Sequence, residues 1–141
     1  MKISRMIYMV LAWLFVAGVL VQVFLAGMVI VARQMGWGSH IGLGHTLGLP
    51  LIFMVATAYL GKLPGSLKRL TWLLLGVYIL QADVLIFMRA SAPVLSALHP
   101  VLALVDFALG LALAWKATVI VRAEETAAPA IPVPADGLSA D

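Results

Sequence analysis

Residues 6–32 read MIYMVLAWLFVAGVLVQVFLAGMVIVA, a run without a charged side chain. A helix needs about 20 predominantly apolar residues to cross the hydrocarbon of a bilayer, and this run is longer. A secretory signal peptide is the alternative, but its apolar region covers only about 7–15 residues and ends in a small-residue cleavage site. We therefore expect residues 6–32 to form a membrane-spanning helix.

The composition of the whole chain is typical of a protein surrounded by lipid. Of its 141 residues, 64% are hydrophobic and 11% charged, and the mean hydropathy is +1.11. The absence of cysteine excludes disulfides, thiolate metal ligands and thiol nucleophiles. The net charge of +3 does not indicate a nucleic-acid partner, because the basic residues lie at the ends of apolar runs and form no stripe.

Three further apolar segments follow, at about residues 41–60, 70–88 and 98–118, separated by short connections that contain Gly, Pro, Lys or Arg. We expect residues 1–122 to form an all-α, integral membrane four-helix up-down bundle in the lipid bilayer. Residues 123–141 are rich in Ala and Pro and carry most of the acidic side chains, which predicts a disordered cytoplasmic tail.

The distribution of lysine and arginine predicts the orientation of the chain. Arg33 and Arg89 follow the two outward-going spans. Seven cations lie at the other ends of the spans: Lys2, Arg5, Lys62, Lys68, Arg69, Lys116 and Arg122. The positive-inside rule then places both termini in the cytoplasm, and we expect a multi-pass protein of the bacterial inner membrane.

The order of polar residues suggests an internal duplication. Gln22, Arg33 and His45 on the first two spans recur as a second set, Gln81, Arg89 and His99, on the last two. These equivalences predict two parallel helical hairpins related by an axis along the membrane normal. The alternative is that interfacial arginines recur in any four-span protein.

Two histidines lie near the starts of the returning helices. In the simplest up-down bundle the second and fourth spans are diagonal, so His45 and His99 face each other across roughly 11–14 Å. That distance accommodates a haem whose iron takes one imidazole on each side. We predict His45 and His99 as metal ligands, with Gly48 and Ala103 as small cofactor-binding neighbours on the same faces. Close helix packing or interfacial hydrogen bonding without a cofactor is the open alternative.

His40 lies about 140° from His45 around a continuous helix, so both cannot face one site. We therefore assign His40 to a loop or helix cap. Four other polar residues lie within the spans, where polar side chains normally face the protein interior or water. We predict proton-binding or structural roles for Asp83, Asp106, Gln22 and Gln81.

Several short segments resemble a family of small, uncharacterised four-span bacterial membrane proteins, over about residues 5–120. They are residues 11–14 (LAWL), 22–27 (QVFLAG), 44–48 (GHTLG) and 98–104 (LHPVLAL). The resemblance implies the four-span fold and the histidine pair, and it implies no established activity. A looser likeness, to four-helix membrane b-type cytochromes, depends on the two histidines alone.

The leading hypothesis is a haem b protein with bis-histidine ligation that exchanges electrons with quinone or a larger membrane complex. A non-catalytic accessory subunit that binds pigment or lipid is the alternative. A proton-coupled carrier that acts as a homo-oligomer is the third hypothesis. The sequence contains no P-loop, nucleophile elbow or HExxH motif, so hydrolase and phosphate chemistry have no support. All three hypotheses describe a protein that is not an enzyme by itself.

Overall fold

The structure is a computed structural model, and it describes residues 1–127. Over this range it is helical without strands, and four helical stretches are long and apolar enough to cross a membrane. The first is α1 (Lys2–Ile30) and the second is α2 (Gly38–Thr46) with α3 (Gly48–Leu60). The third joins α4 (Gly65–Ile79), the π-helix η1 (Leu80–Val84) and α5 (Leu85–Phe87); the fourth joins α6 (Pro93–Ser96) and α7 (His99–Thr126). The predicted all-α, four-span fold is confirmed.

Several span boundaries differ from those predicted. The third span begins at Gly65 rather than near residue 70, and the fourth begins at Pro93 rather than near residue 98. The second span begins at Gly38 rather than near residue 41, because none of the glycines in this stretch takes a positive φ and the chain is helical through them. α7 continues to Thr126, so residues 123–126 are helical and not part of a tail. The rest of the predicted tail, residues 128–141, lies outside the described residues.

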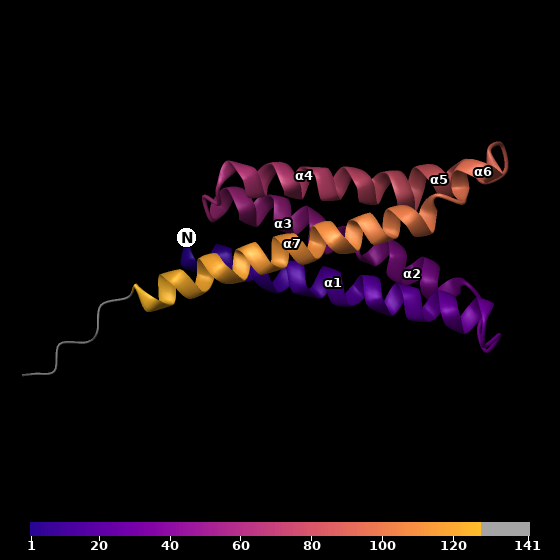
Figure 1. Cartoon of the computed structure of the whole chain (residues 1–141), viewed down its shortest axis with the longest axis horizontal. Coiled ribbons are helices and arrows are strands. Elements are labelled where there is room, and N and C mark those ends of the chain that lie inside the picture. Colours follow the sequence, from indigo (N-terminus) through magenta and orange to yellow (C-terminus); the bar gives the residue numbers. More distant parts are fainter. Residues whose placement is uncertain (128–141) are drawn as a thin grey trace, which may run out of the picture.

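The four spans form a bundle in which neighbours in sequence are also neighbours in space (Figure 1). α1 packs against α3 and α7, and α4 packs against the same two helices. The second and fourth spans are therefore diagonal, as the sequence predicts for short connections. Two of the connections between spans contain a residue in the left-handed backbone conformation. These residues are Arg33, with φ 54°, and Lys62, with φ 48°.

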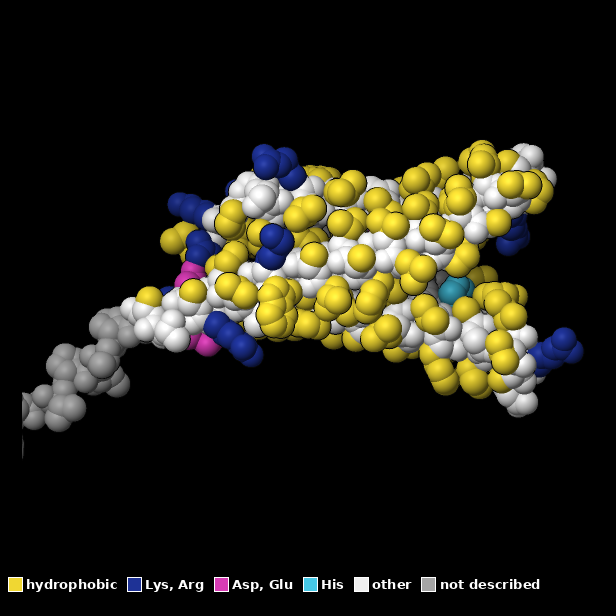
Figure 2. All heavy atoms as spheres, in the orientation of Figure 1, with side chains coloured by type: hydrophobic (Ala, Val, Ile, Leu, Met, Phe, Trp, Pro, Cys, Tyr) yellow, Lys and Arg dark blue, Asp and Glu magenta, His cyan; other side chains and the backbone are white. Residues whose placement is uncertain are grey.

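The outer surface of the bundle is apolar along its length, and Lys and Arg gather at its ends (Figure 2). Phe87, Trp115 and Phe24 are 88%, 65% and 64% exposed. A soluble protein rarely exposes contiguous apolar surface of this extent, whereas lipid covers it without cost. This distribution supports a bilayer environment.

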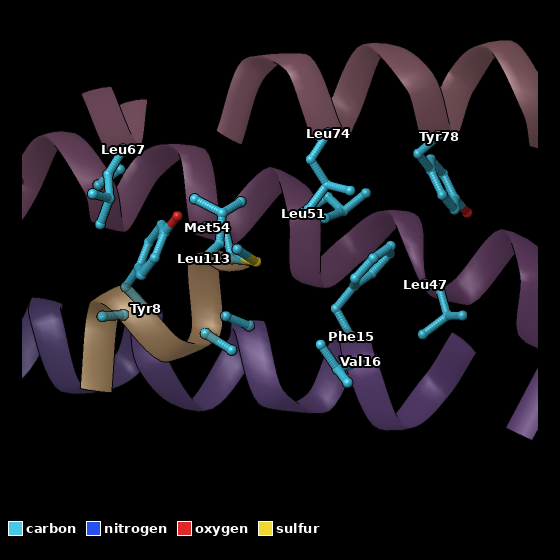
Figure 3. Packing of buried hydrophobic residues seen from close by; sticks show 14 of the residues in the cluster. Tyr8, Phe15, Val16, Leu47, Leu51, Met54, Leu67, Leu74, Tyr78 and Leu113 are labelled. Carbon is cyan, nitrogen blue, oxygen red and sulfur yellow. The ribbon is translucent and has the colours of Figure 1, made fainter. Parts of the chain in front are cut away.

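The core consists of side chains from all four spans that interlock along the bundle axis (Figure 3). Tyr8, Phe15, Leu51, Met54, Leu74 and Leu113 are fully buried. The Tyr8 and Thr71 hydroxyl oxygens lie 2.6 Å apart, and Thr71 donates to the Leu67 carbonyl oxygen at 2.8 Å. Tyr8 therefore donates to Thr71, and this chain of bonds leaves neither buried hydroxyl hydrogen unpaired.

Two indole hydrogen bonds show that the hairpins are related by an approximate two-fold axis. Trp13 Nε1 donates to Thr118 Oγ1 at 3.1 Å, and Trp72 Nε1 donates to the Tyr59 hydroxyl at 3.2 Å. Adding 59 to Trp13 gives Trp72, and adding 59 to Tyr59 gives Thr118. Each hairpin thus makes the same contact to the other, as a two-fold relation requires.

One end of the bundle carries most of the cations, and we call it the basic end. Polar contacts of Arg5 join the helices there. Arg5 Nε donates to the Gly61 carbonyl oxygen at 2.7 Å, and the Arg5 guanidinium forms an ion pair with Glu124. The opposite end carries the histidines, and we call it the histidine end. The bundle is open at this end.

Candidate functional site

The two hairpin tips separate at the histidine end and leave a notch between them. In Figure 1 the α5–α6 tip and the α1–α2 tip diverge, and Figure 2 shows a histidine side chain at the base of the notch. Two histidines build this site: His40 in the first turn of α2, and His99, the first residue of α7. Both are half-buried.

Both histidines are held by the same kind of bond. His40 Nδ1 lies 3.1 Å from the carbonyl oxygen of Gln22, and His99 Nδ1 lies 2.8 Å from that of Gln81. In each pair the histidine follows its glutamine by 18 residues. The contact is thus repeated in both hairpins, and His40 is the counterpart of His99.

The carbonyl partners determine which ring nitrogen carries the proton. A carbonyl oxygen can only accept, so Nδ1 of each histidine must donate. In a neutral imidazole the other nitrogen, Nε2, then has a free lone pair. Metal-bound histidines in proteins are commonly oriented in this way, through a second-shell carbonyl.

The rings of His40 and His99, one from each hairpin, lie in an edge contact with each other. Their centres lie 6.3 Å apart, with an angle of 67° between the ring planes. Trp37 packs edge-on against His40 from another side, with 5.4 Å between ring centres. His40 is therefore fixed by a hydrogen bond and an aromatic contact. The predicted position of His40 in a loop or cap is wrong, because α2 begins at Gly38 and Trp37 is its N-cap.

His45 does not join this pair. Its side chain is 66% exposed, and its Nδ1 lies 3.8 Å from Oδ1 of Asp83, which is 53% exposed. The predicted equivalence of His45 with His99 is therefore wrong, and His40 takes its place. His40 lies on the face of α2 that meets the other hairpin, and His45 lies about 140° away around the same helix.

The small residues predicted beside the cofactor have different surroundings. A methyl group added to Gly48 would lie 3.3 Å from Cε1 of Tyr78, so the tyrosine ring already fills that space. The Tyr78 hydroxyl donates to the Gly44 carbonyl oxygen. Ala103 is half-buried on α7. A methyl group added to Gly44 would lie 2.7 Å from Nε2 of Gln22, whose backbone carbonyl is bonded to His40.

Buried acceptors without donors surround the same region. Among residues 1–127 the side-chain oxygens of Gln22 and Gln81 and both carboxyl oxygens of Asp106 are buried with no hydrogen-bond partner. Asp106 is 1% exposed and has the Gln81 side chain as a neighbour, although no donor lies within bonding distance of its oxygens. Gln81 lies in η1, and π-helical turns are frequent at functional sites.

The described residues contain no group of three or more His, Asp or Glu side chains that could hold a metal ion. Two converging imidazoles are too few for a bare ion such as Zn²⁺, which takes four ligands. They match a metal whose remaining ligands come from a macrocycle.

Sequence reasoning missed His40, although a signal for it exists. The Gln22–His40 and Gln81–His99 separations are equal, whereas Arg33–His45 and Arg89–His99 differ. Anchoring the repeat on the glutamines would have selected His40.

Comparison with known proteins gives one family and no individual relative. No curated protein and no solved structure matches the chain. One family model matches a segment of the chain that begins at Gln22, contains His40 and Gln81, and ends before His99. Residues 22–84 match the model of a family of unknown function (DUF6220), in keeping with a small membrane family that has no assigned activity.

Proposed function

We propose that this protein binds one b-type haem at the histidine end, with His40 and His99 as axial ligands, and transfers electrons within the membrane. The observation that carries the proposal is the convergence of two equivalent imidazoles, one from each hairpin, with their Nδ1 atoms bonded to carbonyl oxygens. His40 takes the role that the sequence alone suggested for His45.

The spacing of the rings fits two ligands on one metal. A metal–nitrogen bond of about 2 Å on each side and about 1 Å from each nitrogen to its ring centre give a separation of about 6 Å. The ring centres of His40 and His99 lie 6.3 Å apart.

The chain supplies what a haem site needs from its protein. The Gln22 and Gln81 carbonyls hold the rings and leave Nε2 of each ring free to bind a metal. The exposed Arg33 and Arg89 bring positive charge to the histidine end, where haem carboxylates require it. When bound, haem b supplies a one-electron iron couple whose potential depends on the ligands and on burial.

The partners and location follow from the charge distribution. With the basic end in the cytoplasm, the haem lies near the outer face of a bacterial inner membrane, and both termini are cytoplasmic. A site so near the surface of the bilayer suits electron exchange with quinone or with a larger membrane complex.

A non-catalytic accessory subunit is the second candidate function. The observation in its favour is that His45 and Asp83 face outward from the bundle, at a position where a partner chain would contact them. The two functions are compatible, because haem-binding subunits also assemble with other chains.

An absorption spectrum tests the proposal. Protein produced with ample haem and purified in detergent should show a Soret band and, after reduction, an α band. His40→Ala and His99→Ala should remove the pigment, whereas His45→Ala, the matched control, should retain it. Colourless wild-type protein, or pigment that survives loss of either ligand, would contradict the proposal.

A further inference from the structure

A titratable pair lies on the outside of the bundle within the membrane-spanning stretches. His45 on α2 and Asp83 on η1 come from different hairpins, and their side chains are 66% and 53% exposed. The 3.8 Å between Nδ1 and Oδ1 is too long for a hydrogen bond, so each group has bonding capacity to spare.

The pair breaks the two-fold relation of the hairpins. The counterparts of His45 and Asp83 at the 59-residue offset are Leu104 and Phe24, and these are 67% and 64% exposed. One face of the bundle is therefore apolar where the opposite face is polar. An apolar face suits lipid, whereas polar side chains at membrane depth normally meet protein or water.

The surroundings of the pair permit close approach of another helix. Gly42 lies one turn before His45 on α2, and Gly76 belongs to the same span as Asp83. No atom lies within 4 Å of a methyl group placed at either glycine. Polar side chains flanked by small residues are typical of helix interfaces in membranes.

We infer that this face binds a second copy of the same chain. A basic and an acidic group on one face are self-complementary under a two-fold operation, because His45 of one copy then meets Asp83 of the other, and the reverse. A dimer of this kind gives both groups a second partner and removes them from lipid. The inference is independent of haem binding, since neither residue belongs to the proposed haem site.

The lack of cysteine makes a cross-linking test direct. Two differently tagged copies, one with His45→Cys and one with Asp83→Cys, are produced together and oxidised mildly in native membranes. The dimer predicts a disulfide between the two tagged copies. The matched control, copies with Leu104→Cys and Phe24→Cys, should give at least several-fold less product, because these residues lie on the opposite face.

Each other outcome overturns the inference. Equal yields from both pairs indicate random collision, and no product from either pair indicates a free surface. Disulfide-linked species must have the mass of two chains, so a heavier product containing a different protein would also overturn it.

A charge exchange checks the pairing without cysteine. His45→Asp alone should reduce dimer formation in vesicles several-fold, measured by energy transfer between labelled copies, because it places acidic groups opposite each other. Adding Asp83→His should restore the original level. A double variant that remains as monomeric as the single variant would contradict the reciprocal contact.

Discussion

The ring centres of His40 and His99 lie 6.3 Å apart, although the two residues belong to different hairpins. Each ring is bonded to a carbonyl of its own hairpin, to Gln22 in one case and Gln81 in the other. A ligand held by both rings therefore connects the two halves of the bundle at the end where the hairpin tips separate.

This bridging position predicts that haem stabilises the fold. A ligand that binds only the folded protein at 100 times its dissociation constant adds about 2.7 kcal/mol to the free energy of unfolding. Thermal unfolding in detergent should therefore shift upward with haem in the wild type. His99→Ala should remove the shift, and an equal shift in that variant would mean that haem binds elsewhere.

The two indole bonds between hairpins should contribute equally. Polar contacts between membrane helices are worth about 0.6 kcal/mol on average, because the unfolded helices in lipid also find partners. Double-mutant cycles for Trp13→Phe with Thr118→Val, and for Trp72→Phe with Tyr59→Phe, should give similar coupling energies of this size. Coupling confined to one pair would show that the contacts are not equivalent.

Gly110 is required by the contact between α7 and α1. An added methyl group would lie 3.0 Å from Cδ1 of Phe15, whose side chain is fully buried. Gly110→Ala should lower the free energy of unfolding by about 1–3 kcal/mol. Gly27→Ala is the control, since a methyl group there meets nothing within 4 Å, and it should have little effect. Equal costs for both variants would contradict the packing described.

Asp106 is predicted to reduce stability. Its carboxyl oxygens are buried without a donor among the described residues, and its counterpart in the first hairpin is the buried Leu47. An unsatisfied buried polar group costs about 1–3 kcal/mol, so Asp106→Leu should raise the free energy of unfolding by about that amount. Asp106→Asn should change it much less. A loss of stability with leucine would indicate that the carboxyl group binds water or a ligand.

The number of spans could be predicted from sequence because the signal is strong and local. Apolar runs of about 20 residues, bounded by cations and glycine–proline connections, have few alternatives in a chain this apolar. Short connections then place the second and fourth spans diagonally, which α3 and α7 confirm.

The identity of the inward histidine could not be predicted in the same way. His40 and His45 lie on the same short helix about 140° apart, and a repeat anchored on the arginines selects His45. The glycines of that stretch suit a turn as well as a helix, so the pattern does not settle which histidine faces inward. The π-helical turn at Leu80–Val84 is also invisible to a 3.6-residue pattern. It contributes to the placement of Gln81 toward the interior and Asp83 toward the outside.

Electron paramagnetic resonance of the oxidised, haem-loaded protein tests the central claim most directly. Two imidazoles whose planes differ by 67° should give a low-spin ferric signal with the large anisotropy of strongly rotated ligand planes. The signal should persist in His45→Ala and be lost in His40→Ala and in His99→Ala. A high-spin signal in the wild type, or a low-spin signal that depends on His45 instead of His40, would contradict ligation by this pair.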